Sequence, residues 1–188
     1  MAPEQTLTPA ARKLLDAAAA LFYAEGIHAV GVEAVAARAG VTKKTLYDRF
    51  GSKEALVVAY LRERDDRWRA VLEARLAAVD PGRPALEAFW DEAERWSREH
   101  GPRGCAAINA RAETGDPEHP VAQEVTRQKA WVHDLLRGHV AAAGAADVEA
   151  TTSALVLLHD GALVESGLRT VDAPFTTARA ATRALIGS

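Results

Sequence analysis

Apolar residues recur every three to four positions along most of the chain, which is the spacing that places them on one face of an α-helix. No stretch alternates apolar and polar residues as a half-buried strand would. The pattern predicts a first helix over residues 8–25, a second over 32–39 and a third over 42–50. A fourth helix is predicted from Ser52 to about Val79. We therefore expect an all-α fold.

Glycine and proline residues mark the ends of these helices. Gly26 follows the first helix, Gly51 follows the third, and Gly40 stands between the second and third, where a left-handed turn suits glycine. The run Asp80-Pro81-Gly82 is a strong stop for the fourth helix, and we expect it to be the hinge between an N-terminal head and a C-terminal body. Further breaks divide the rest into about five helices, at residues 101–102, 115–117, 144 and 172–174.

The composition is that of a globular protein. The chain has 188 residues, of which 48% are hydrophobic, so it can bury a real core. No run approaches the ~20 apolar residues of a membrane span. Residues 1–8 carry an acid and a proline where a signal peptide would be basic and then apolar. The single Cys105 needs no oxidising compartment and is most simply a small buried residue. We expect a soluble cytoplasmic protein.

The charge is distributed unevenly. The net charge of −3 is unusual for a nucleic-acid binder. Residues 1–53, however, hold seven Lys or Arg against five Asp or Glu, a balance of +2, which leaves −5 for the remainder. A basic head on an acidic body fits a protein that touches phosphate with one end only. The charge run over residues 62–67 of the predicted fourth helix is interpreted as a solvated face.

The segment from Gly26 to Leu56 carries the clearest functional pattern. The third helix begins with a hydroxyl cap, Thr42, followed by Lys43, Lys44 and Thr45. In a helix-turn-helix motif, the N-terminal residues of the second helix of the pair enter the major groove of DNA. The two lysines are therefore candidates for contacts with guanine or phosphate, and the second threonine for a base contact.

A second cluster of candidate DNA contacts lies just beyond. Tyr47 is placed to reach the flanking backbone, while Ser52 and Lys53 open the fourth helix and supply another helix N-terminus that can bind phosphate. Leu46 and Phe50 are expected to face inward. An amphipathic hairpin with a merely cationic surface is the alternative. The combination of a glycine turn, a capped basic helix and a second capped helix favours DNA binding.

The run of residues 36–56 resembles the signature of the TetR family of bacterial one-component repressors. The likeness is close over residues 8–60, and residues 104–113 are similar to one branch of the family. The resemblance implies a helix-turn-helix domain over 1–53 and an effector-binding and dimerisation domain over 54–188. It also implies a homodimer on a palindromic DNA operator, most often a repressor, that a small-molecule effector releases.

By position, the resemblance makes Thr42, Tyr47 and Lys53 phosphate contacts. Two positions depart from the family pattern. Gly31 stands where a Ser or Thr often caps the second helix, and it offers no hydroxyl. Lys44 replaces a common glycine, so base preference does not transfer from relatives.

Two C-terminal helices are candidates for the dimer interface. The stretch 147–169 is apolar nearly all round, with four aliphatic residues in a row at 155–158 and glycines at 161 and 167 that permit close approach. The last helix, from Pro174, adds an apolar stripe that includes Leu185. Pairing both helices with their copies would give a four-helix interface. The alternative is that they form only the core of the monomer.

The effector pocket is predicted from aromatic and polar residues of the body. Aromatic residues at helical spacing are also typical of plain core. The seven pocket candidates are Trp90, Cys105, Asn109, Glu113, Trp131, His159 and Asp160. Such groups could orient a polar ligand or bind a divalent metal, but no compact ligand spacing is present, and we assign no metal and no cofactor. His119, beside Pro120, is interpreted as a surface or capping residue.

Two other classes of function compete with the regulator. A helical-bundle enzyme or ligand-binding protein would use Glu113, His159 and Asp160, but the sequence has no Ser-His-Asp order, phosphate-binding glycine loop or paired Glu-x-x-His motif. A DNA-packaging protein would need a more basic surface and no dedicated body. The sequence therefore favours a transcriptional regulator that is not an enzyme.

Overall fold

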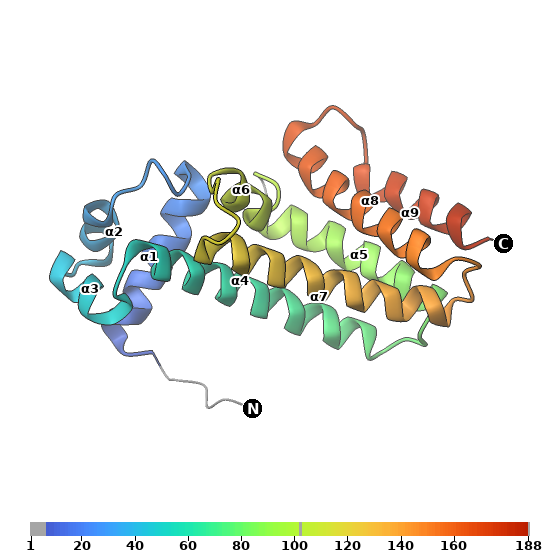
Figure 1. Cartoon of the computed structure of the whole chain (residues 1–188), viewed down its shortest axis with the longest axis horizontal. Helices are drawn as coiled ribbons and strands as arrows, with labels where there is room; N and C mark the ends of the chain where they lie inside the picture. Colours follow the sequence, from blue (N-terminus) through green and yellow to red (C-terminus); the bar gives the residue numbers. More distant parts are fainter. Residues whose placement is uncertain (1–6, 102, 188) are drawn as a thin grey trace. The chain divides into compact units, whose positions relative to one another are not determined.

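The computed structural model describes residues 7–101 and 103–187, and all the regular structure in these ranges is helical (Figure 1). This confirms the predicted all-α class. Residues 1–6, at the chain start, and Pro102, at one of the predicted helix breaks, lie outside the described residues. The helices are α1 (Pro9–Glu25), α2 (Val32–Ala39), α3 (Lys43–Phe50), α4 (Lys53–Leu76), α5 (Arg83–His100), α6 (Ala106–Ala112), α7 (Pro120–Ala142), α8 (Val148–Leu168) and α9 (Pro174–Ile186).

The predicted helix ends agree with the structure to within a few residues. Thr8 caps α1, since its side-chain oxygen accepts the Ala11 N–H at 3.3 Å. The largest difference is at the end of α4, which stops at Leu76 rather than near Val79. The last residues turn more tightly, with the Val79 N–H bonded to the carbonyl three residues earlier at 3.2 Å. Among the described residues, no helix has the length and apolar character needed to cross a membrane.

The chain divides into two compact units whose boundaries fall inside helices. The first contains residues 7–64 and 107–125, and the second contains 65–106 and 126–187. The turn at 80–82 ends α4 as expected, but both of its sides belong to the second unit, so the prediction of a hinge there is wrong. The reason is that α4 is one continuous helix whose two halves pack with different partners.

The core of the first unit is built from one face of each of its N-terminal helices. Leu46 is the buried residue of α3 and is fully inaccessible, as predicted, while Phe50 is only half-buried. Phe22 of α1 meets Tyr60 of α4, with their ring centroids 6.2 Å apart. The apolar spacing of three and four residues in the sequence produces these faces. Other buried members are Leu14, Ala18, Val32, Val35, Leu56 and Val57.

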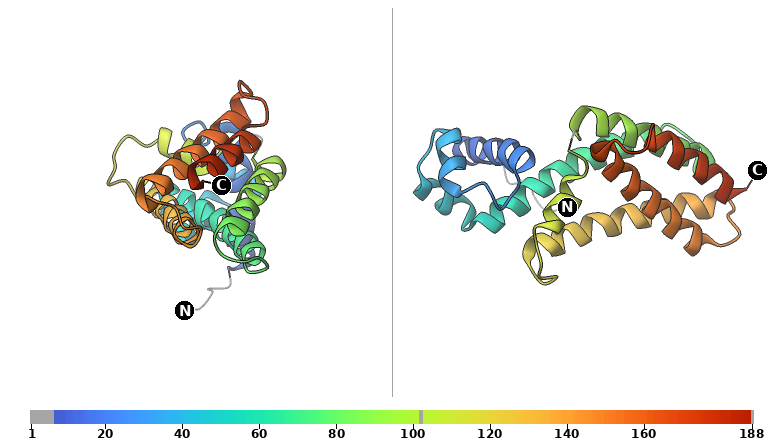
Figure 2. Two further views of the ribbon diagram at one scale, coloured as in Figure 1. Left: turned by 90° about the vertical axis from the view of Figure 1, so that its right-hand side faces the viewer. Right: turned by 90° about the horizontal axis from the view of Figure 1, so that it is seen from above.

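The core of the second unit is aromatic at its centre. Phe89 and Trp90 of α5 are completely buried and pack edge to face, with centroids 5.2 Å apart. In this unit α8 and α9 run side by side (Figures 1 and 2). The surrounding buried residues come from four other helices and include Trp68, Leu72, Leu136, Leu155 and Phe175.

One part of the charge run on α4 is not solvated, which corrects the sequence-based interpretation. Asp65 is only 7% exposed. Its carboxylate pairs with Arg69, one turn later at 2.7 Å, and with Arg127 of α7 at 3.1 Å. Burial raises the pKa of Asp65, and the two guanidinium groups oppose that shift. The carboxylate can be buried here because Arg127, from a helix distant in sequence, pairs with it. The spacing of residues along one helix does not reveal such a partner.

Candidate nucleic-acid interface

The turn between α2 and α3 is built on Gly40. Its φ of 66° lies in the left-handed region, where any side chain would add strain. The Gly40 N–H bonds to the Ala37 carbonyl at 3.1 Å and the Val41 N–H to the Ala36 carbonyl at 3.0 Å. These two bonds form a Schellman motif, which satisfies the last carbonyls of α2. The turn therefore fixes the direction in which α3 leaves α2.

The start of α3 is held by two threonines. The Thr42 side-chain oxygen accepts the Thr45 N–H at 3.1 Å and lies 2.9 Å from the Thr45 hydroxyl. The predicted cap is thus present, and the two hydroxyl groups also bond to each other. Because Leu46 anchors the opposite face in the core, the first turn of α3 presents its polar side chains to solvent.

The two lysines of this turn are exposed, and each has an acidic partner. The Lys43 side chain is 51% exposed and pairs with Glu33 of α2, while its ammonium lies 6.0 Å from the centroid of the Tyr47 ring. The Lys44 side chain is 82% exposed and pairs with Asp48 at 2.8 Å. Hydrogen bonding to Glu33 raises the pKa of Lys43, and the same contact lowers the pKa of Glu33.

Sequence reasoning missed both acidic partners. Asp48 follows Lys44 by four residues, so helical spacing alone signals that pair. Glu33 is ten residues from Lys43 and on another helix, so only the folded arrangement of α2 and α3 shows the contact.

The second helix start lies at α4. The Ser52 side-chain oxygen accepts the Ala55 N–H at 3.1 Å, which confirms the predicted cap. Lys53 is the first residue of α4 and is half-buried. Glu54 accepts a hydrogen bond from its own backbone N–H and interacts with the Ser52 hydroxyl, and both contacts lower its pKa. Tyr47 is 42% exposed. All seven predicted DNA-binding residues thus lie in one compact unit.

Five of the predicted effector-pocket residues lie in the second unit, and two of them form its aromatic centre. His159 of α8 is buried against Trp90, with ring centroids 6.3 Å apart, and against Phe89, at 5.1 Å. Burial lowers the pKa of His159, so the ring is neutral at pH 7. The Trp90 Nε1 is buried without a hydrogen-bond partner among the described residues, while the His159 Nδ1 lies 3.6 Å from a carboxylate oxygen of Asp160.

Three of the effector-pocket candidates contact two basic residues, Lys129 and Arg69, that sequence reasoning did not single out. Lys129 of α7 pairs with Asp160 at 2.5 Å and also bonds to Cys105. Burial disfavours the charged Lys129, but its interactions with Cys105 and with the Asp160 carboxylate outweigh this effect, and the pKa of Lys129 is raised. Trp131 packs against Arg69, whose guanidinium carbon lies 4.3 Å from the ring centroid. Lys129 has no motif that would reveal it, because its partners come from two other chain segments.

Asn109 and Glu113 belong to the first unit. Both oxygens of the Glu113 carboxylate accept backbone N–H groups of the turn after α1, from Ile27 at 3.0 Å and from His28 at 2.6 Å. Glu113 therefore secures this turn, and its place in an effector pocket stays a prediction. His119 accepts the Val121 N–H at 3.2 Å at the start of α7, as its capping interpretation expected.

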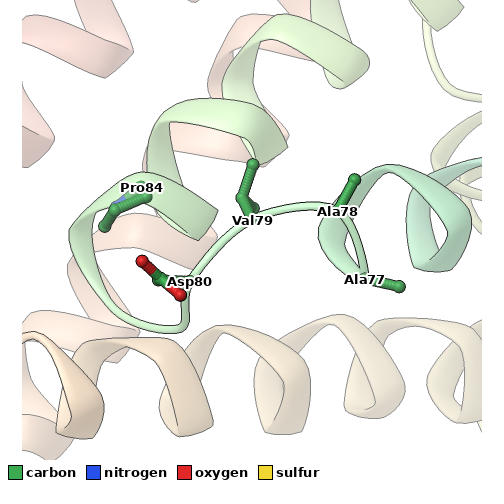
Figure 3. A pocket seen from close by; sticks show the side chains of 5 residues that line it. All are labelled: Ala77, Ala78, Val79, Asp80 and Pro84. Carbon is green, nitrogen blue, oxygen red and sulfur yellow. The ribbon is translucent and has the colours of Figure 1, made fainter.

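Two surface recesses of the second unit are lined by residues other than the predicted pocket candidates. One of about 470 Å³ lies at the turn between α4 and α5, where Figure 3 shows Asp80 and Pro84 together with Ala77, Ala78 and Val79. Another of about 450 Å³ lies between α5 and the end of α9. No group of three or more His, Cys, Asp or Glu side chains in the described ranges is arranged to hold a metal ion.

Comparison with known proteins decides the family. The structure of SCO4454, a TetR-family transcriptional regulator from Streptomyces coelicolor, matches with a TM-score of 0.88 and 34% identity, over 95% of this chain and 94% of that one. The chain belongs to the TetR family. The family model described as "Bacterial regulatory proteins, tetR family" matches residues 14–60, which contain the helix-turn-helix.

The curated relatives of this TetR-family protein match less than half of the chain. The transcriptional activator FasR of Mycolicibacterium smegmatis is 40% identical over 90 residues, which cover 46% of this chain and 41% of FasR. The regulator RutR of Escherichia coli K12 is 43% identical over 63 residues, or 34% of this chain and 30% of RutR. The chain thus spans less than half the length of these relatives. All are transcriptional regulators rather than enzymes, which agrees with the predicted class.

Proposed function

We propose that this TetR-family protein is a ligand-responsive transcriptional regulator of the cytoplasm, most simply a repressor, that binds a palindromic operator as a homodimer. The observation that carries the proposal is the pair of capped helix starts in the first unit. Thr42 and Ser52 cap α3 and α4, and three lysines stand at these caps. Helix N-termini with exposed cations attract phosphate, and α3 is the helix that a helix-turn-helix inserts into the major groove.

The caps suggest that the seven predicted DNA-binding residues have two different roles, contacts with bases and contacts with phosphates. Lys43, Lys44 and Thr45, on the first turn of α3, would face base edges, because this turn is the part of the helix that enters the groove. Since the Thr45 hydroxyl bonds to Thr42, its methyl group is the part free to pack on thymine. The phosphate contacts would come from the residues at the edges of this surface, namely Thr42, Tyr47, Ser52 and Lys53.

An exposed apolar stripe on α8 supports the homodimer. Leu157 is 73% exposed, Val164 38% and Leu168 61%, and their spacing places them on one face of the helix. Gly161 lies on the same face, and no atom from other parts of the described chain lies within 4 Å of the position of a Cβ, so a second copy could approach closely there. Gly167 differs, because Arg103 and Gly104 of the same chain already pack against it. Large apolar side chains aligned in this way are typical of a protein interface.

The body would hold the effector, in keeping with the predicted division into a DNA-binding part over 1–53 and an effector and dimerisation part over 54–188. The buried Trp90 Nε1 can donate a hydrogen bond, whereas the His159 Nδ1 faces the Asp160 carboxylate. A polar atom buried without a partner is costly, and a ligand with one acceptor would satisfy the Trp90 N–H. A small, largely apolar effector with such a group fits this aromatic centre.

Binding measurements with the full chain test the regulator directly. Fluorescence anisotropy should show that the protein binds a duplex from the region upstream of its own gene more tightly than a scrambled duplex of equal length. A ligand that raises the thermal stability of the protein should then weaken that binding. Equal affinity for both duplexes would favour a DNA-packaging role. Turnover of a substrate by DNA-free protein, without specific binding, would favour the enzyme.

A further inference from the structure

Both lysines that are predicted to face bases are neutralised by carboxylates of the same unit. Lys43 pairs with Glu33, and Lys44 pairs with Asp48. Lys53, the predicted phosphate contact at α4, makes no ion pair among the described residues. The ion-paired acids therefore stand at the lysines of the groove-facing turn, whereas Lys53 has its neighbour Glu54 nearby without an ion pair in the part of the chain that the structure describes.

The Glu33 contact joins the beginnings of the two helices of the motif. Glu33 lies in the first turn of α2 and its carboxylate accepts its own backbone N–H, so it is held at that helix start. Lys43 is the first residue of α3, and its ammonium pairs with this carboxylate and lies 6.0 Å from the centroid of the Tyr47 ring. Both side chains of the pair are more than half exposed. An ion pair between exposed side chains adds little to folding stability, so its main effect is expected in DNA binding.

A carboxylate in contact with a DNA-facing lysine changes what that lysine can gain from DNA. Phosphate and the carboxylate are competing anions, and the charge of Lys43 cannot neutralise both at once. The Glu33 carboxylate also repels a phosphate that approaches Lys43. The two anions would then be closer than the ~8–10 Å beyond which salt screens charges. The strength of sequence-independent binding depends on how many phosphates the cations of the protein neutralise. A lysine that is paired with a carboxylate neutralises none and does not contribute.

We propose that Glu33 is a specificity-determining residue that competes with DNA for Lys43, with Asp48 acting in the same way on Lys44. This proposal rests on the DNA-binding function proposed above. On DNA of arbitrary sequence, Lys43 stays with Glu33 and contributes little. At the operator, a base with two acceptors in the major groove draws the lysine away, because a guanine offers it O6 and N7 together. The acid thus lowers non-specific affinity more than specific affinity.

The effect of removing the acid can be stated as a change in salt dependence. Glu33→Gln frees one lysine, so the slope of log K against log salt on a scrambled duplex should steepen by about 0.9. At 0.1 M salt, one more phosphate contact corresponds to roughly a five- to eightfold gain in affinity for that duplex. The gain on operator DNA should be smaller, so the ratio of specific to non-specific affinity falls.

The experiment compares the full-length wild type with Glu33→Gln on upstream duplexes and on a scrambled duplex, by anisotropy over about 0.05–0.2 M salt. Glu25→Gln is the matched control, because it removes the same charge from the same unit and no ion pair with Lys43 or Lys44 involves Glu25. Circular dichroism verifies that each variant folds. In Lys43→Gln, the further change Glu33→Gln should have no more effect than Glu25→Gln has.

The outcomes separate this inference from the function on which it rests. Failure of the wild type to prefer any upstream duplex overturns the proposed regulator itself. If the wild type binds specifically but Glu33→Gln and Glu25→Gln change the slope equally, only the competition is refuted. A loss of operator affinity in Glu33→Gln with unchanged binding to the scrambled duplex also refutes it, since Glu33 would then contact a base such as cytosine directly.

Discussion

Replacing Glu113 by alanine should loosen the turn after α1 while leaving the helices formed. The Glu113 carboxylate accepts the N–H groups of Ile27 and His28, which follow the end of α1. At Gly26, with a φ of 95°, a Cβ would lie 3.3 Å from the nearer carboxylate oxygen, so the backbone passes close to this side chain. No other acceptor for these two N–H groups is seen among the described contacts.

The magnitude follows from the two hydrogen bonds. A hydrogen bond to a charged group contributes about 1.5–3 kcal/mol net when it is buried. The Ile27 bond is partly buried and the His28 bond is exposed, so water can replace the second but not fully the first. We therefore expect a local loss of about 2 kcal/mol, which corresponds to roughly a thirtyfold increase in opening of the turn.

Amide hydrogen exchange followed by NMR measures this opening residue by residue. The Ile27 and His28 amides should exchange roughly ten- to thirtyfold faster in Glu113→Ala, with an intermediate rate in Glu113→Gln, because an amide offers one oxygen instead of two. Their intrinsic rates stay the same, since position 113 is not adjacent to them in sequence. Glu118→Ala, which removes an exposed carboxylate from the following loop, is the control. Unchanged protection of both amides in folded Glu113→Ala would refute the reasoning.

Three further predictions concern DNA, assembly and pH. Lys53→Ala should weaken binding to all duplexes alike and reduce the salt slope by about 0.9, and a change confined to particular base pairs would argue for a base contact instead. Leu157→Glu should shift the mass measured by light scattering towards the 20.1 kDa of one chain, because it places a charge on the exposed stripe of α8; a mass equal to that of the wild type would place the interface elsewhere. Burial lowers the pKa of His159, so the unfolded chain binds a proton there more readily than the folded one. The free energy of unfolding of the wild type should therefore fall as the pH drops below about 6.5, by at most about 1.4 kcal/mol per pH unit. Urea denaturation at pH 7.5 and 5.5 should show this loss reduced in His159→Leu, and His139, whose pKa burial also lowers, contributes equally to both proteins. An equal loss in the two proteins would show that His159 is not the titrating group.

The features that the sequence predicted well are those set by neighbouring residues. The caps at Thr8, Thr42 and Ser52 and the left-handed turn at Gly40 depend on atoms within about five positions, and the structure has all four. The apolar faces of α1 and α4 follow from helical spacing in the same way. Local signals of this kind are sufficient to locate the helix-turn-helix from the sequence alone.

The features that the sequence did not reveal depend on contacts between distant segments. Burial of Asp65 requires Arg127, and the interaction of Lys43 requires Glu33 on another helix. The Glu113 carboxylate bonds to the turn after α1, which lies 85 and 86 residues away in the sequence. Helical periodicity specifies which face of a helix is apolar but not which helix packs against it.

The DNA-binding unit of this protein is not one continuous stretch of sequence, and this limits how it can be exchanged between relatives. A chimera joined after residue 64 would remove residues 107–125, which belong to the same compact unit. Arg62 would lose Glu124, its partner at 2.9 Å whose side chain is 2% exposed, and the turn after α1 would lose its carboxylate. A transplant intended to retarget such a regulator to a new operator should therefore carry both segments, or restore both contacts on the receiving body.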